Sequence, residues 1–266
     1  MSCKEIISNF HTHTPYCGHA VGLPVDYLNK IKKYNIKTIG FSEHAYIAVP
    51  SFKHTIKSME DMDKYIDDVK KLKEITSCEV LTGLEVDYIP SFNDYYKFLK
   101  RKFDYLTLSI HFVVFDDHYS YGTRFTYLEE MKLYCDYMAS GMATGLFAFV
   151  NHPDLFLNDH MNDYRLTDEI IAFEKEIIDN AIKYEAPLEL NIAQFRRYNH
   201  LYQKDNIRDD FWHYVGETPA KVIINFDAHN PDEIDIDIYN TVMNYAKSHK
   251  LNLITDFRKC GTDESN

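Results

Sequence analysis

Short apolar runs alternate with helix-like segments along the whole chain, and this alternation limits the fold more than any other feature. The expected strands span 5–13, 37–44, 79–87, 104–112, 145–153, 187–193, 221–229 and 251–257. Each is rich in apolar or β-branched residues and is bounded by turn or charged residues. The expected helices between them span 24–34, 58–75, 167–185 and 231–250. This order predicts an α/β fold with a parallel sheet, either open or closed into a barrel.

Two of the expected helices carry clear start signals. Ser58 opens one of them, which has acidic residues early and lysines late, as the helix dipole favours. Thr167 opens another and is followed by Asp and Glu, which is also a capping signal. We find no linker and no point at which the alternation stops, so we expect a single domain over residues 1–266.

Residue types that bind metals end almost every expected strand. These residues are His11 and His13, Glu43 and His44, Glu85 and Asp87, His111, His152, and Asp227 and His229. In α/β folds the catalytic groups gather at the carboxyl ends of the strands. A closed barrel brings all these ends to one rim, whereas an open sheet spreads them too far apart for one compact site. The distribution therefore favours a barrel with its site at the C-terminal rim of the strands.

Spacing within the runs supports metal ligation. His11 and His13 alternate around Thr12, so both point to one face of a strand, and Asp227 and His229 repeat this pattern. Alone, each strand-end histidine is more simply a hydrogen-bonded structural residue. Together they are hard to explain without cations, because buried ionisable groups need partners. Imidazole and carboxylate ligands suit zinc, iron or manganese.

Composition limits the setting and the partners. The formal net charge is −12 and no basic stripe is visible, which disfavours a large nucleic-acid interface. We find no membrane span and no signal-peptide pattern, so we expect a cytoplasmic protein. The five cysteines are widely spaced, which predicts free thiols. Cys17 lies among the histidines, but a small apolar filler is its simpler interpretation. The oligomeric state leaves no mark in the sequence.

The motifs HxH, "SEH", "GLEVD", "SIH", "NHPD" and "DAH" occur in this order between His11 and His229. In this respect the chain resembles the polymerase and histidinol phosphatase (PHP) superfamily. The opening "FHTHTPYCGHA", the segment "GLEVDY" and the total length are most similar to stand-alone histidinol-phosphate phosphatases. The resemblance implies a distorted (β/α)7 barrel with a trinuclear centre of zinc, manganese or iron.

The resemblance also implies nine metal ligands in three sets. They are His11, His13, Glu85 and Asp227 for the first metal, Glu85, His111 and His152 for the second, and His19, His44 and His229 for the third. Glu85 would bridge the first two ions. Glu43 and Asp154 neighbour ligands, and we expect them either to orient His44 and His152 or to face solvent.

The activity implied by the resemblance is hydrolysis of L-histidinol phosphate to L-histidinol and phosphate, a step of histidine biosynthesis. We expect in-line attack on phosphorus by a hydroxide that bridges two metals, with Glu85 holding both ions. The leaving oxygen also needs a proton, and Asp227 and His229 are the candidates for supplying it.

Substrate contacts are expected on segments that reach the same rim. Arg197 follows the sixth expected strand, and its planar fork matches phosphate oxygens, although a solvated basic loop is an alternative. The further candidates are His200 and Arg165 for the phosphate, and Asp116, Asp117 and Glu43 for the amine and imidazole.

Two other functions fit part of the pattern. A PHP-type phosphodiesterase or exonuclease acting on nucleotides would use a similar centre, but the acidic net charge disfavours nucleic acid. A protein that stores or senses metal would need only the ligands, and an arginine-bearing loop at the rim argues against it. Comparing monoester with diester substrates would separate these functions.

Overall fold

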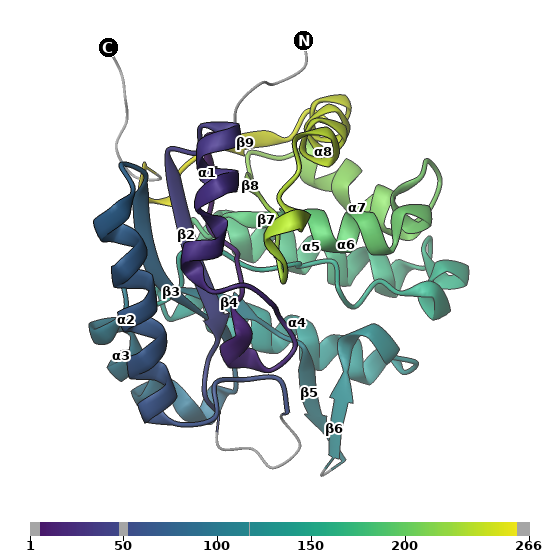
Figure 1. Ribbon diagram of the computed structural model, residues 1–266. Coiled ribbons are helices and arrows are strands. Elements are labelled where there is room, and N and C mark those ends of the chain that lie inside the picture. Colours follow the sequence, from purple (N-terminus) through teal and green to yellow (C-terminus); the bar gives the residue numbers. More distant parts are fainter. Residues whose placement is uncertain (1–5, 48–52, 117, 260–266) are drawn as a thin grey trace.

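Parallel strands form a curled sheet with helices around it (Figure 1), in a computed structural model that describes residues 6–47, 53–116 and 118–259. One run of parallel pairs contains β1 (Ser8–Asn9), β2 (Thr38–His44), β3 (Glu79–Asp87) and β4 (Tyr105–Ser109). The other contains β7 (Leu188–Asn191), β8 (Lys221–Asn225) and β9 (Asn252–Ile254). The predicted parallel sheet is confirmed.

Single bridges join these two runs into a distorted barrel. Val150 pairs in parallel with Leu108 on one side and with Leu188 on the other, so it takes the place of a fifth strand. On the other side Thr12, after β1, pairs in parallel with Ala228, after β8, and the amide of His13 donates to the carbonyl oxygen of Ala228 at 2.8 Å. The predicted closure of the sheet is therefore achieved with very little regular pairing.

Helices cover the outside of the curled sheet (Figure 1). They are α1 (Leu28–Tyr34), α2 (Met59–Ile75), α3 (Asn93–Lys102), α4 (Leu128–Ala143), α5 (Asp168–Lys183), α6 (Ile192–Arg197), α7 (Ile207–Gly216) and α8 (Ile236–Ser248). Both predicted caps form, because Ser58 accepts from the amide of Asp61 and Thr167 from that of Ile170. In the described residues, no helix combines the length and the apolar character needed to cross a membrane.

Several elements differ from the prediction. The run 145–153 was expected as a strand but forms only the bridge at Val150. Gly145 has φ 65° and His152 has φ 28°, so the backbone leaves the extended conformation at both ends of this run. Sequence reasoning also missed α3, α4, α6 and α7, and the antiparallel hairpin of β5 (Phe112–Phe115) and β6 (His118–Tyr121).

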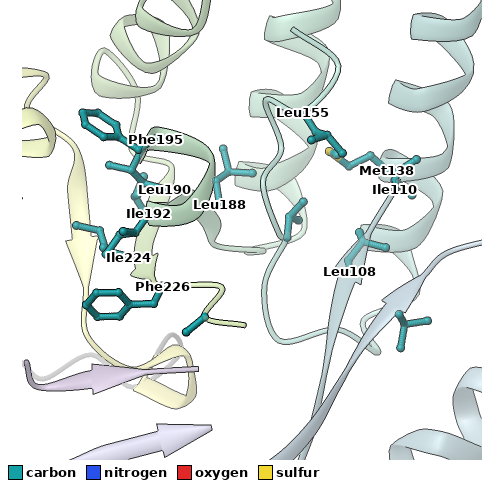
Figure 2. Close-up of a cluster of buried hydrophobic side chains, with 14 of the residues drawn as sticks. Leu108, Ile110, Met138, Leu155, Leu188, Leu190, Ile192, Phe195, Ile224 and Phe226 are labelled. Carbon is teal, nitrogen blue, oxygen red and sulfur yellow. The ribbon is translucent and has the colours of Figure 1, made fainter. Parts of the chain in front are cut away.

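The barrel interior is apolar at its N-terminal end and polar above it. Phe10, Tyr105, Phe149 and Ile223 form a small separate cluster inside, and the ring of Tyr105 occupies the space that a side chain at Gly83 would need. The outward residues of the strands pack with the helices, as Figure 2 shows for Leu108, Leu188, Leu190 and Ile224, which lie near Ile192 and Phe195 of α6 or near Met138 of α4. The inward polar residues of the strands therefore lie between this apolar cluster and the C-terminal rim of the barrel.

Candidate metal centre

Four side-chain donors converge at the C-terminal rim of the barrel. His11 and His13 follow β1, Glu85 lies in β3, and Asp227 follows β8. The Nε2 atoms of His11 and His13 are 3.1 Å apart. Both lie 3.3 Å from Glu85 Oε2, and they lie 3.4 Å and 3.1 Å from Asp227 Oδ1. The two histidines are fully buried, and the two carboxylates are almost completely buried.

The hydrogen bonds behind the imidazoles determine what their Nε2 atoms carry. His11 Nδ1 lies 2.8 Å from Glu189 Oε1, and His13 Nδ1 lies 3.3 Å from Glu43 Oε1. Each Nδ1 has a carboxylate to donate to, so in the neutral tautomer each Nε2 presents a lone pair. Two lone pairs and two carboxylate oxygens then face one another, an arrangement that needs a positive charge between them.

The spacing of these donors fits a metal ion. Zinc bonds of about 2.0–2.1 Å in a tetrahedral site place neighbouring ligand atoms roughly 3.3 Å apart. Five of the distances between the four donors are 3.1–3.4 Å. In addition, Asp227 Oδ1 is buried and accepts no hydrogen bond from any residue that the structure describes. The residues of the first predicted set therefore fit a divalent cation.

The second predicted set shares Glu85. His152 Nε2 lies 3.1 Å and His111 Nε2 lies 3.7 Å from Glu85 Oε1, the oxygen that faces away from the first set. Asp87 Oδ1 accepts from both the amide and Nδ1 of His111 at 2.9 Å, so the Nε2 of this ring points to Glu85. The two oxygens of Glu85 therefore face two separate groups of imidazoles, as a bridging ligand requires.

The third predicted set is gathered less tightly. The ring of His19 lies 5.4 Å from that of His44 and 4.5 Å from that of His229, and the last two are 6.1 Å apart. His13 stacks between His44 and His229 and shares a compact donor triplet with them. Burial lowers the pKa of His44 well below its usual value, and burial with nearby His13 lowers that of His229 to about 4. Both imidazoles are therefore neutral near pH 7.

Electrostatics favour positive charge between the donors of the first set. Burial alone would lower the pKa of His11, but Glu189, Asp227 and Glu85 together raise it well above 6.5. Burial would raise the pKa values of Glu85 and Asp227, but the surrounding histidines hold both well below their usual range. The carboxylates are therefore ionised, and either protons or a metal cation must balance their charge.

Backbone strain marks two of the predicted ligands. His152 has φ 28° and Asp227 has φ 51°, a region that residues other than glycine seldom adopt. Neighbouring bonds hold both positions: the amide of His152 donates to Glu189 Oε2 at 3.1 Å, and Asn191 donates to Asp227 Oδ2 at 3.2 Å. Such strain persists only where the surrounding structure fixes it.

A cavity of about 630 Å³ opens over the donors, and we call it the main cavity. Its lining includes Glu85, Asp227 and His229 on the side of the centre, and Arg196, Arg197 and Glu233 farther out. Arg196 Nη2 donates to Glu233 Oε1 at 2.7 Å, whereas Arg197 makes no ion pair with any described residue. Arg197 is therefore the more available cation for an anionic substrate.

Comparison with known proteins identifies the family. Residues 9–193 match the PHP domain, which is more than half of the chain. The chain belongs to the PHP domain family. It is 34% identical to a histidinol-phosphatase from Bacillus subtilis over 122 residues, a match that spans only 45% of that protein. It is 24% identical over 236 residues to a probable histidinol-phosphatase from Deinococcus radiodurans, covering 84% of this chain and 86% of that one.

A solved structure shows the same fold at greater sequence distance. The chain superposes with a TM-score of 0.72 on a histidinol phosphate phosphatase from Lactococcus lactis, crystallised with zinc, L-histidinol and phosphate. The two are 15% identical, and the match covers 94% of this chain and 95% of the other. This agreement confirms the predicted distorted α/β barrel.

Two acidic residues next to predicted ligands differ in what they contact. Glu43 was considered as a contact for the substrate amine or a support for His44, and it is fully buried. Its Oε1 accepts from the amide of His44 at 2.9 Å, as a support for His44 would, and also contacts His13 Nδ1, while its Oε2 accepts from the amide of Thr14 at 2.9 Å. Asp154 does not bond to the ring of His152; it accepts from Tyr202 and Trp212 at 2.7 Å and 3.0 Å.

Three predicted substrate contacts lie away from the main cavity, which they do not line. His200 is exposed and pairs with Asp159. Arg165 pairs with Asp210 at 2.7 Å on α7. Asp116 is exposed near the tip of the β5–β6 hairpin, and Asp117 is outside the described residues. Proximity in sequence to a rim strand did not bring these side chains to the rim, because the intervening turns direct them elsewhere.

Sequence reasoning missed Glu189, which supports the centre from below. It is fully buried in β7 and bonds His11, the amide of His152, Asn191 and Asn225. The available signal was an acidic residue in the middle of a short apolar run, which is costly unless partners satisfy it.

Cys17 behaves mainly as a buried filler, although its Sγ lies close to donor atoms of His19 and His229. Its Sγ donates to the carbonyl oxygen of Thr14 at 3.2 Å, and burial together with Glu43 raises its pKa to about 12. Cys17, Cys78 and Cys135 are free, as predicted, whereas Cys3 and Cys260 are outside the described residues.

Proposed function

We propose that this PHP domain is a metal-dependent phosphoric monoester hydrolase that converts L-histidinol phosphate to L-histidinol and phosphate. The observation that carries the proposal is the group of four buried donors spaced 3.1–3.4 Å apart under an arginine-lined cavity. The names of the two curated relatives support the choice of substrate. A cytoplasmic location stays a prediction.

We propose three divalent ions, of zinc, manganese or iron, held by the three ligand sets given above. When bound, such ions lower the pKa of water to yield a nucleophile and neutralise phosphoryl oxygens. The chain itself positions the ester. Arg197 is proposed to bind the phosphate at the rim, because its guanidinium matches the phosphate oxygens and has no acidic partner among the described residues. Asp227 and His229 remain the candidates for the leaving-group proton, and because their lowered pKa values leave Asp227 ionised and His229 neutral, either would first take that proton from the attacking water.

The test compares esters on protein loaded with zinc or manganese. We expect phosphate release from L-histidinol phosphate to exceed that from a simple aryl phosphate, with little release from a bis-aryl phosphate. Metal analysis of the same sample should find close to three ions per chain. A preference for the diester would favour the phosphodiesterase, and no turnover of any ester would favour a binding protein.

Two histidine-to-alanine variants, one at the proposed centre and one at the surface, test the proposed centre. His13→Ala should abolish turnover and lower the metal content, because His13 Nε2 lies within 3.3 Å of both Glu85 and Asp227. His213→Ala removes an exposed imidazole on α7 and should leave both values unchanged. Equal activity in the two variants would reject the proposed centre.

A further inference from the structure

A second cavity, of about 470 Å³, opens beside the main cavity, and we call it the side cavity. The two share the walls made by His19, His44, His111 and Thr123. The side cavity alone is lined by Lys53, His54, Tyr121 and Arg124. A group bound at the proposed centre therefore has two directions in which its remainder can extend.

The side cavity differs from the main cavity in charge. Among the described residues no Asp or Glu lines it, whereas the main cavity contains Glu85, Asp227 and Glu233. Lys53 and Arg124 make no ion pair with any residue that the structure describes. Two cations without acidic partners therefore face one pocket of a chain whose net charge is −12.

An aromatic wall accompanies these cations. Tyr121 ends β6 and is 38% exposed, and Gly122–Arg124 form the turn that follows. The ring of Tyr121 packs against that of Phe112 at 6.2 Å, so the hairpin supports it from behind. An exposed ring held in this way offers a face on which a planar group can stack.

We propose that the side cavity binds the leaving group of phosphate monoesters whose alcohol is aromatic and carries a carboxylate. The ring would lie against Tyr121 and the carboxylate between Lys53 and Arg124, where charge-assisted hydrogen bonds are strongest. Positive charge there disfavours a cationic leaving group, so we place the ammonium group of histidinol in the main cavity, toward Glu233.

This proposal gives the chain a further hydrolase activity, and its chemistry rests on the proposed function. Water adds its oxygen to phosphorus, the bond between phosphorus and the ester oxygen breaks, and the phenol leaves with a proton. No other reactant is needed. The binding part of the proposal does not depend on turnover and can be measured separately.

The test uses an unsubstituted ester, phenyl phosphate, and two esters whose para substituents are similar in size and opposite in charge: 4-(carboxymethyl)phenyl phosphate and 4-(aminomethyl)phenyl phosphate. The methylene group keeps the acidities of the three phenols close. We expect kcat/KM of the zinc-loaded protein to be about tenfold higher for the carboxymethyl than for the aminomethyl ester, and this ratio should fall as salt is added. A ratio near one in the unaltered protein would overturn the proposal.

The double variant Lys53→Met/Arg124→Met should bring this ratio to about one, since both cations are removed. The control Lys204→Met/Lys247→Met removes the same charge from residues that line neither cavity and should keep the ratio. An equal loss of kcat/KM for all three esters, with the ratio preserved, would show instead that Lys53 and Arg124 serve the transferred phosphate. That result would also overturn the proposal.

Calorimetry separates this proposal from the proposed function. Benzylphosphonate and 4-(carboxymethyl)benzylphosphonate cannot be hydrolysed, and the zinc-loaded protein should bind the second about tenfold more tightly. The double variant should lose this difference. If no ester is hydrolysed, the proposed function fails, but the difference in affinity between the two phosphonates still tests whether the side cavity binds a carboxylate. Equal affinities for the two phosphonates would reject that binding.

Discussion

Glu189 controls which nitrogen of His11 faces the centre. Its Oε1 lies 2.8 Å from His11 Nδ1, and its Oε2 accepts from the amide of His152. One carboxylate therefore orients the ring of one predicted ligand and the backbone of another. A carboxylate behind an imidazole also makes that imidazole a stronger base, which strengthens its bond to a metal.

Replacing Glu189 with Gln should weaken metal binding about 10- to 100-fold, because the amide keeps the shape but not the charge. Competition with a chromogenic chelator measures the zinc affinity. Glu79→Gln is the control, since Glu79 begins β3 at the opposite end of the strand and pairs with Arg258. Equal affinities for the two variants would mean that Glu189 does not tune the centre.

Glu174 should make stability depend on pH. Its side chain is buried in α5, neither carboxyl oxygen is hydrogen-bonded within the described residues, and burial followed by Asp210 raises its pKa to about 8. The unfolded chain has the usual value of 4.5. Between these two pH values the folded state binds more protons, so the free energy of unfolding falls as pH rises and levels off above about 8.

Glu174→Gln should remove this dependence and stabilise the protein by up to about 4 kcal/mol at pH 9 relative to its effect at pH 5. Urea unfolding of both proteins at pH 5, 7 and 9 measures the difference. An offset between the two proteins that stays constant with pH would show that Glu174 is not the titrating group.

Most of the predicted ligands were accessible from sequence because they end apolar strand runs, where little but function explains a histidine or an acid; His19 lies in a loop and was indicated only by the family resemblance. Substrate contacts carried no such signal. Arg124 ends a single 3-10 turn and Lys53 lies in a loop, and nothing in their spacing indicates that they line one cavity. Their meeting depends on the β5–β6 hairpin and the loop after β2, which sequence periodicity does not describe.

At the level of elements, α7 ties two rim segments together through Arg208. This fully buried guanidinium donates to the carbonyl oxygen of Leu157 at 2.8 Å and to Tyr202 at 3.1 Å. Tyr202 in turn donates to Asp154 at 2.7 Å. The segment that carries His152 is thus fixed to the segment that follows α6 by a buried network with one cation and one anion.

Arg208→Met should lower the free energy of unfolding by about 3–5 kcal/mol, because it leaves the charge of Asp154 buried without its cation. Arg165→Met is the matched control: it breaks a partly exposed ion pair to Asp210 of α7, whose side chains are 23% and 20% exposed, and should cost about 1 kcal/mol. Urea titrations compare the two. Similar losses would mean that the network does not stabilise the fold.

The strand boundaries predicted from the sequence are accurate for strands that pair over many residues. The predicted 79–87 is the strand Glu79–Asp87, and 37–44 differs from β2 by one residue. The prediction of a strand over 145–153 was wrong, because this apolar segment leaves the extended conformation at both ends. Apolar composition indicates that a segment is buried, but it does not by itself indicate that the backbone is extended.

At the scale of the whole molecule, the centre joins most strands of the barrel, so metal ions should stabilise the entire fold. Ligands that bind only the folded state shift unfolding by mass action. Treatment with a chelator should abolish phosphate release, and adding zinc back should raise the unfolding midpoint by several degrees in a thermal scan. His13→Ala should respond much less to zinc. An unchanged midpoint after zinc addition would contradict metal binding at the centre.

The barrel could be predicted because ligand-type residues at many strand ends make sense only if those ends meet. How the barrel closes could not be predicted. Closure uses one bridge at Val150 and one between Thr12 and Ala228, and single bridges leave no periodic pattern in the sequence.

The closing bridge between Thr12 and Ala228 sets an order of events during synthesis of the chain. Next to this bridge, the amide of Phe10 donates to the side chain of Asn225, 215 positions later. His11 and His13 flank Thr12 on one side of the bridge, and Asp227 and His229 flank Ala228 on the other. A chain still emerging from the ribosome therefore holds the first histidines long before their carboxylate partner exists. The complete donor set forms only when the barrel closes, so we expect the proposed first set to bind metal only after closure.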